Sequence, residues 1–168
     1  MLEKFPNSVI LFNIVGASNA GLREFDAAIE SYKKALEIKP DYAEAYYNMG
    51  IALKDKGDPE AAIDSYKQAL KIKPDYAEAY YNMGNALKDK GDPEAAIDSY
   101  KQALKIKPDY AEAYNNMGVA LKRVVFTKPS SGLQEVISSM IDRKNNVNPV
   151  AAISLLKFEP VVKELFEK

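Results

Sequence analysis

Apolar residues in the middle of the chain recur at helical intervals. Two stripes can be read between residues 43 and 72, and they consist of Tyr46, Met49, Gly50 and Leu53, and of Ala62, Tyr66 and Ala69. Spacings of three and four residues place each set on one face of a helix. The pattern therefore predicts two amphipathic helices, each about 14 residues long.

Turn residues between the stripes set the limits of these helices. Gly57 supplies the left-handed conformation that ends the first helix. Asp58 caps the second helix, and Pro59 takes its first position, where no amide donor is lost. Pro74 forces the chain out of the second helix. The unit is therefore expected to be a helix–turn–helix.

The start of the first helix carries the spacing of a capping box. Asp41 can accept from free amides of the first turn while Glu44 reaches back. The same pair recurs as Asp75 with Glu78 and as Asp109 with Glu112. We expect three first helices to begin at these boxes.

The helix pair belongs to a repeat with a period of 34 residues. Residues 77–110 repeat residues 43–76 except that Asn85 replaces Ile51. We divide the chain into a remnant of a preceding repeat (1–8), three full repeats (9–42, 43–76 and 77–110), a partial fourth repeat (111–130) and C-terminal capping helices (131–168).

Small and large residues alternate within each unit in a recognisable order. Seven positions recur in register, and they hold in order an aromatic residue, a large apolar residue, glycine, alanine, an aromatic residue, alanine and proline. In the first repeat these are Phe12, Val15, Gly16, Ala28, Tyr32, Ala35 and Pro40. This set resembles the tetratricopeptide repeat (TPR) family over about residues 9–123. The resemblance implies an all-α, right-handed superhelical solenoid of antiparallel helix pairs. It also implies that the first helices line a concave groove that holds a peptide or partner protein.

Both ends of the chain depart from the repeat. Residues 2–8 match the end of a second helix, which suggests a fragment of a longer array; a natural N-terminus that resembles a repeat end is the alternative. In a fragment, the apolar run Val9–Phe12 could drive end-to-end self-association. At the other end, three helices are expected to cap the stack: one over about 132–143, one that begins at Pro149 after the cap residue Asn148, and one over about 160–167. The segment AAISLLKFEP resembles the stretch that joins TPR arrays to transferase domains in long bacterial proteins.

Composition removes several classes of chemistry. The 168 residues include no Cys and no His, so thiolate nucleophiles, sulfur-based zinc sites and the commonest general base are missing. The net charge of −1 argues against a nucleic-acid partner. No apolar run reaches membrane-spanning length, and no signal peptide is visible. We expect a cytoplasmic, non-enzymatic protein with no cofactor, metal, nucleic-acid or membrane partner.

A second strip of residues adjoins the core stripe on the first helices. By helical geometry it holds the candidate binding residues Tyr47, Asn48, Tyr81, Asn82, Asn85, Lys88, Asn115 and Asn116. Asparagine can donate to and accept from peptide backbone, and tyrosine offers an apolar face with a polar tip. The row of Asn48, Asn82 and Asn116 is similar to the asparagine row of the O-linked GlcNAc transferases. In the first repeat, Ile14 stands where this row would have an asparagine. The alternative is that Tyr and Asn are simply tolerated on exposed helices.

Charges along this strip favour some ligands over others. Some TPR modules grip a carboxylate with Lys or Arg, but the corresponding positions here begin with Glu44, Glu78 and Glu112. Three glutamates would repel an acidic tail, so a mixed-charge or basic peptide is favoured; a solvated charged face is the alternative.

Two functions remain open at this point. The first is a scaffold that binds an extended peptide or partner protein in the groove. The second is a structural spacer or oligomerisation segment of a larger bacterial transferase, with no peptide ligand of its own.

Overall fold

The computed structural model describes residues 8–123, and that part of the chain contains seven α-helices and no strand. They are α1 (Val9–Gly21), α2 (Phe25–Ile38), α3 (Ala43–Lys56), α4 (Pro59–Ile72), α5 (Ala77–Lys90), α6 (Pro93–Ile106) and α7 (Ala111–Arg123). The expected repeat remnant, the capping helices and the segment that resembles a transferase linker lie outside the described residues.

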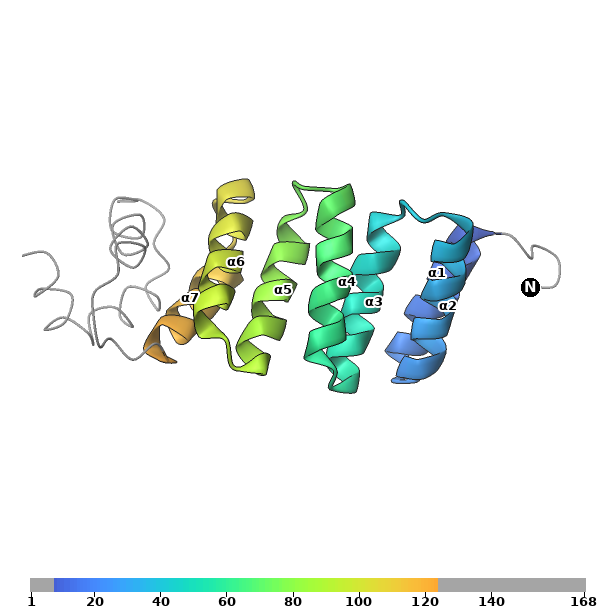
Figure 1. The fold of residues 1–168 in the computed structure, drawn as a ribbon, viewed down its shortest axis with the longest axis horizontal. Coiled ribbons are helices and arrows are strands. Elements are labelled where there is room, and N and C mark those ends of the chain that lie inside the picture. The colour runs from blue at the N-terminus through green and yellow to red at the C-terminus, as the bar shows by residue number, and fades with distance from the viewer. Residues whose placement is uncertain (1–7, 124–168) are drawn as a thin grey trace, which may run out of the picture.

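The helices form an all-α repeat array. Each helix packs against the next one along the chain, and the first helices of successive repeats, α1, α3, α5 and α7, also contact one another. Figure 1 shows the resulting row, which runs in chain order from α1 (blue) to α7 (orange). The fold class expected from the repeat is confirmed.

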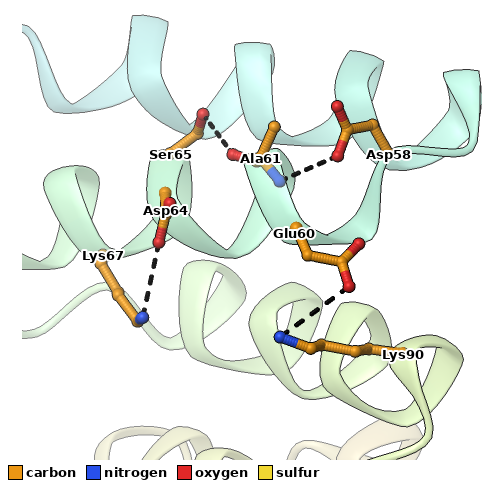
Figure 2. Close-up of polar contacts among 7 residues, drawn as sticks. All are labelled: Asp58, Glu60, Ala61, Asp64, Ser65, Lys67 and Lys90. Carbon is orange, nitrogen blue, oxygen red and sulfur yellow. Dashed lines mark hydrogen bonds and ion pairs between the residues drawn. The ribbon is translucent and has the colours of Figure 1, made fainter.

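The turn between the two helices of a repeat has the expected chemistry. Gly57 ends α3 with a φ of 98°, and Gly91 ends α5 with a φ of 93°, conformations that a residue with a Cβ rarely adopts. The Asp58 side chain accepts a hydrogen bond of 3.0 Å from the amide of Ala61 at the start of α4, as Figure 2 shows. These predicted boundaries are confirmed.

The prediction that capping boxes start the first helices is wrong. Helix α3 begins at Ala43 with Tyr42 as its N-cap residue, and no side chain accepts a hydrogen bond there. The Tyr42 carbonyl instead accepts from the amides of Ala45 and Tyr46, at 3.1 and 3.3 Å. Because the helix starts two residues after Asp41, that side chain lies outside the first turn. The same holds before α5 and α7, where Asp75 and Asp109 also stand two residues ahead of the helix.

A tyrosine fills a notch at a glycine inside each repeat. Tyr32, Tyr66 and Tyr100, on the second helices, are exposed by 2% or less. A Cβ added to Gly50 would lie 2.6 Å from the Tyr66 ring, and one added to Gly84 would lie 2.5 Å from the Tyr100 ring. Only glycine therefore lets the two helices approach while the ring lies between them.

The apolar stripe of the first helices is less buried than the sequence suggests. Tyr46 and Met49 are half-buried, whereas Ala45 and Ala52, which flank the predicted stripe, are fully buried. Each inner first helix packs on the second helix of the preceding repeat as well as on its own partner. Small side chains are needed where this additional helix comes closest, so alanine rather than the large residues occupies the most buried positions.

The two near-identical repeats differ in one buried hydrogen bond. The Tyr100 hydroxyl donates to Oδ1 of Asn85 at 2.8 Å. The Tyr66 hydroxyl is buried without a partner, because Ile51 stands where the third repeat has Asn85. Burial raises the pKa of both phenols well above the usual value, so both carry a proton that needs an acceptor.

Replacing Gly84 by Ala tests the notch. We expect Gly84→Ala to lower the free energy of unfolding by about 1–3 kcal/mol, because the new methyl group overlaps the Tyr100 ring. Gly21→Ala is the matched control, since a Cβ there meets nothing within 4 Å. Chemical denaturation measures both, and an equal effect of the two substitutions would contradict the notch.

Removing the hydroxyls of Tyr66 and Tyr100 tests whether the Tyr66 hydroxyl lacks a hydrogen-bond acceptor. Tyr100→Phe should cost about 1 kcal/mol, because it removes a hydrogen bond, whereas Tyr66→Phe should be neutral or stabilising. In an Ile51→Asn background, Tyr66→Phe should become as costly as Tyr100→Phe. Denaturation of the four variants measures these differences, and equal costs for Tyr66→Phe and Tyr100→Phe in the parent chain would refute the explanation.

Candidate functional site

The predicted binding residues lie on the first helices of three successive repeats. We use the name ladder face for the side of α3, α5 and α7 that carries Tyr47, Asn48, Tyr81, Asn82, Asn85, Lys88, Asn115 and Asn116. All eight are half-buried, which leaves part of each side chain open to solvent. Helical spacing puts them together because the core stripe beside them is fixed by the glycine notch.

Hydrogen bonds along the ladder face join each repeat to the one before it. Nδ2 of Asn82 donates to the Tyr47 hydroxyl, and Nδ2 of Asn116 donates to the Tyr81 hydroxyl, both at 3.0 Å. In the first step, Nδ2 of Asn48 donates to Oδ1 of Asn13 at 3.2 Å. These bonds use part of the capacity of each amide, which has two N–H donors and an oxygen with two lone pairs. The asparagines are thus held in place by the array itself.

Asn85 and Asn116 each take part in two hydrogen bonds, and Nδ2 of Asn116 uses both of its N–H donors. Oδ1 of Asn85 accepts from the Tyr100 hydroxyl and from Nδ2 of Asn116, both at 2.8 Å. Only the amino group of Asn85 is left for a ligand. Asn115, which takes the place of Tyr47 and Tyr81 in the fourth repeat, has a buried Oδ1 without a hydrogen-bond partner.

Two further tyrosines, which the sequence analysis did not select, extend the ladder face. The Tyr76 ring lies 4.8 Å from the Tyr47 ring, and the Tyr110 ring lies 4.9 Å from the Tyr81 ring, measured between centroids. Both come directly before a first helix, at the same position of successive repeats. Their recurrence with the repeat period was the signal that could have found them.

Lysines cover the outer ring of each pair. Nζ of Lys73 lies 4.4 Å from the centroid of the Tyr76 ring, and Nζ of Lys107 lies 4.7 Å from that of Tyr110. These distances are within the range of cation–π attraction. The aromatic pairs therefore already hold a cation on one side.

Tyr47 and Tyr110 have phenol groups with raised pKa values. Burial, followed by the charges of Tyr81 and Glu78, raises the pKa of Tyr110 to about 12. Burial and the nearby Glu78 also raise the pKa of Tyr47, against a smaller opposing effect of its bond with Asn82. Because the Tyr47 hydroxyl stays neutral, its hydrogen bond with Asn82 persists through the physiological pH range.

The opposite end of the first helices carries mixed charge. Lys54 Nζ lies 2.9 Å from Asp55 Oδ1 on α3. On α5, the Lys88 carbonyl accepts a hydrogen bond of 3.4 Å from the Arg123 guanidinium of α7, a residue that the sequence analysis did not single out. At this end Lys54 is therefore paired with a carboxylate, whereas Arg123 is held by a main-chain carbonyl.

Residues 8–123 contain neither a metal-binding cluster nor a membrane-spanning helix. Among residues 8–123, no group of acidic side chains is arranged to hold a metal ion. In the same part, no helix combines the length and apolar character needed to cross a bilayer.

Known proteins share this arrangement over different lengths. The structure of MamA superimposes with a TM-score of 0.72 at 28% identity, covering 96% of this chain and 85% of that one. A structure of the Thermobaculum terrenum O-GlcNAc transferase gives a TM-score of 0.62 at 27% identity, covering 67% of this chain and 22% of that one. A peroxisomal targeting signal receptor of Kluyveromyces lactis is 39% identical over 56 residues, which are 33% of this chain.

The match to the curated relatives covers only a small part of their length. The chain spans 10% of the length of the Kluyveromyces receptor. The matching curated relatives come from yeasts and a plant, so a bacterial source is not confirmed. The family described as TPR repeat matches residues 24–57, 52–91 and 84–124, more than half of the chain, and the protein therefore belongs to the TPR family.

Proposed function

We propose that this protein is a non-enzymatic scaffold that binds an extended peptide segment of a partner along the ladder face. The observation that carries the proposal is the series of inter-repeat hydrogen bonds made by Asn48, Asn82 and Asn116. It supplies oriented amide groups at one position of three consecutive repeats.

Asparagine side chains that are oriented before the ligand arrives lower the entropic cost of binding. An asparagine that is already fixed by Tyr47 or Tyr81 loses little rotamer freedom when a ligand arrives. The oxygen of either amide can accept from a peptide N–H, and the N–H that Asn82 keeps free can donate to a peptide carbonyl. Main-chain recognition of this kind tolerates many ligand sequences.

The repeat spacing suits an extended chain. Packed helices lie about 8–10 Å apart, and three residues of a polyproline II chain advance about 9 Å. A peptide in that conformation therefore presents an equivalent backbone group to each first helix in turn. Tyr47 and Tyr81 add aromatic surface beside this path, and Lys88 adds a charged end.

Relatives are consistent with this proposal. The yeast proteins matched by 47 to 56 residues of the chain are named as receptors for a peroxisomal targeting signal.

The double substitution Tyr81→Ala with Asn82→Ala tests the site. A peptide selected from a random library against the parent protein should bind the double variant at least about tenfold more weakly, because one aromatic face and one amide are lost together. Fluorescence anisotropy of the labelled peptide gives the dissociation constant.

Two controls separate binding from folding. Gln102→Ala changes an exposed residue of α6 away from the ladder face and should leave binding unchanged. Tyr47→Phe removes the hydrogen bond to Asn82 but keeps the amide, so it should weaken binding less than the double change. If the double variant binds as tightly as the parent, the ladder face is not the binding site.

A second candidate function is a spacer or oligomerisation segment of a larger transferase. Helix α1 contains no charged residue, and Ile10 and Ile14 on it are 67% and 57% exposed. The likeness to the Thermobaculum O-GlcNAc transferase is compatible with such a role. Phe12, in contrast, packs against Ala35, Leu36 and Ala45, so it is a poor probe of self-association.

Light scattering of a double variant tests this candidate. If α1 mediates pairing, the parent protein should form dimers as its concentration rises, and Ile10→Glu with Ile14→Glu should make it monomeric. Ile72→Glu, at a 37% exposed position of α4, is the matched control. A parent protein that stays monomeric at high concentration would exclude this function for the isolated chain.

A further inference from the structure

We infer that the ladder face selects peptides with basic side chains, and that two arginines three positions apart fit it best. This inference rests on the proposed function, because it concerns the peptide bound there. The recognising groups are Glu44, Glu78 and Glu112 together with the paired rings of Tyr47, Tyr76, Tyr81 and Tyr110.

Each aromatic pair lies beside carboxylates. Glu44 stands three residues before Tyr47 on α3, and Glu78 stands three residues before Tyr81 on α5, a spacing that brings side chains together on one helix face. The charge of Glu78 acts on Tyr47 and Tyr76 as well, so this carboxylate also borders the ring pair of the preceding repeat. A cation over these rings would have a carboxylate within reach.

The three carboxylates lack internal cations. In the part of the chain that the structure describes, no lysine or arginine forms an ion pair with Glu44, Glu78 or Glu112. Glu44 accepts only a long bond of 3.4 Å from the Tyr42 hydroxyl. Glu44, Glu78 and Glu112, beside the ladder face, thus offer negative charge to a ligand.

Several carboxylates elsewhere in the array do have ion-pair partners. Lys90 lies 3.8 Å from Glu60, and Lys67 lies 3.5 Å from Asp64, as Figure 2 shows for the contact region of α4 and α5. Lys56 reaches Asp26 across the same kind of repeat junction, at 2.6 Å. These pairs form within a second helix or between a second helix and the end of the next first helix, and none of them involves the glutamate row.

The chemistry of this row matches arginine. A planar guanidinium can stack on a tyrosine ring and form a hydrogen-bonded ion pair with a carboxylate at the same time. Lys73 and Lys107 already occupy one side of the outer rings, which shows that the rings accept a cation. An acidic peptide would instead be repelled by the three glutamates.

The number of such sites is set by sequence. The first repeat has Ile10 and Asn13 in place of Glu and Tyr, and the fourth has Asn115 in place of Tyr. Two complete sites remain, one at Tyr47 and one at Tyr81, separated by one repeat. Side chains three residues apart in a polyproline II chain lie on one face about 9 Å from each other, which suits adjacent repeats.

Three synthetic peptides test the inference. All are twelve residues of Gly, Ser and Pro with blocked ends; the first has two arginines separated by two residues, and the others have glutamine or glutamate at those positions. By anisotropy, the arginine peptide should bind about tenfold more tightly than the glutamine peptide, which corresponds to about 1.4 kcal/mol. Its affinity should also fall as salt is raised.

Two variants locate the effect. Glu78→Gln should weaken the arginine peptide several-fold and leave the glutamine peptide nearly unchanged. Glu94→Gln is the matched control, because Glu94 is also in the first turn of its helix but on α6, away from the ladder face. Equal effects of Glu78→Gln and Glu94→Gln would overturn the inference.

The outcomes separate this inference from the proposed function. If the glutamine or glutamate peptide binds as tightly as the arginine peptide, and Tyr81→Ala with Asn82→Ala abolishes that binding, peptide binding stands and basic selectivity fails. If no peptide binds at millimolar concentration, basic selectivity fails, and the library-selected peptide alone decides the proposed function.

Discussion

Contact between a tyrosine ring and a glycine holds each repeat of this protein together. The Tyr66 ring would lie within 3 Å of any Cβ at Gly50, and the same is true of Tyr100 and Gly84. The two helices of a repeat can therefore approach only with this residue pair. Because the contact recurs with the 34-residue period, successive repeats share one geometry. The side chains on the exposed side of the first helices are therefore placed at the same regular spacing.

The ladder of hydrogen bonds depends on this regular stacking. Asn82 meets Tyr47, and Asn116 meets Tyr81, across the same separation of 35 residues. Each bond forms only when two repeats stand in the same relation. The ladder both ties neighbouring repeats and orients the amides that we propose contact a peptide. Stability and binding therefore use the same side chains, so a loss of binding must always be compared with a loss of folding.

Much of the fold follows from local signals. Gly57, Asp58 and Pro59 mark a helix end and a helix start by backbone conformation and capping alone, and the structure has both there. The start of α3 was predicted wrongly, because Asp41 has the right spacing for a cap but the turn places the Tyr42 carbonyl at the helix start instead. Spacing indicates that a cap is possible, whereas the path of the turn decides whether it forms.

The ladder face shows a similar limit. Helical spacing places Tyr47 and Asn82 on neighbouring first helices, but it cannot show that they bond to each other, since that depends on the stagger between repeats. Tyr76 was missed because it precedes its helix, and its ring reaches Tyr47 only in the stacked array. The orphaned hydroxyl of Tyr66 likewise becomes visible only when Ile51 is seen beside it. Contacts between repeats are thus the part that the sequence does not reveal.

Nuclear magnetic resonance of side-chain amides tests the central claim most directly. In a titration with the peptide that has two arginines, the side-chain amide signals of Asn48, Asn82 and Asn116 should shift, because the ligand is placed against them. The signals of Gln68 and Gln102, exposed on α4 and α6, should stay in place. Shifts confined to Gln68 and Gln102, with the three asparagines unchanged, would contradict the account.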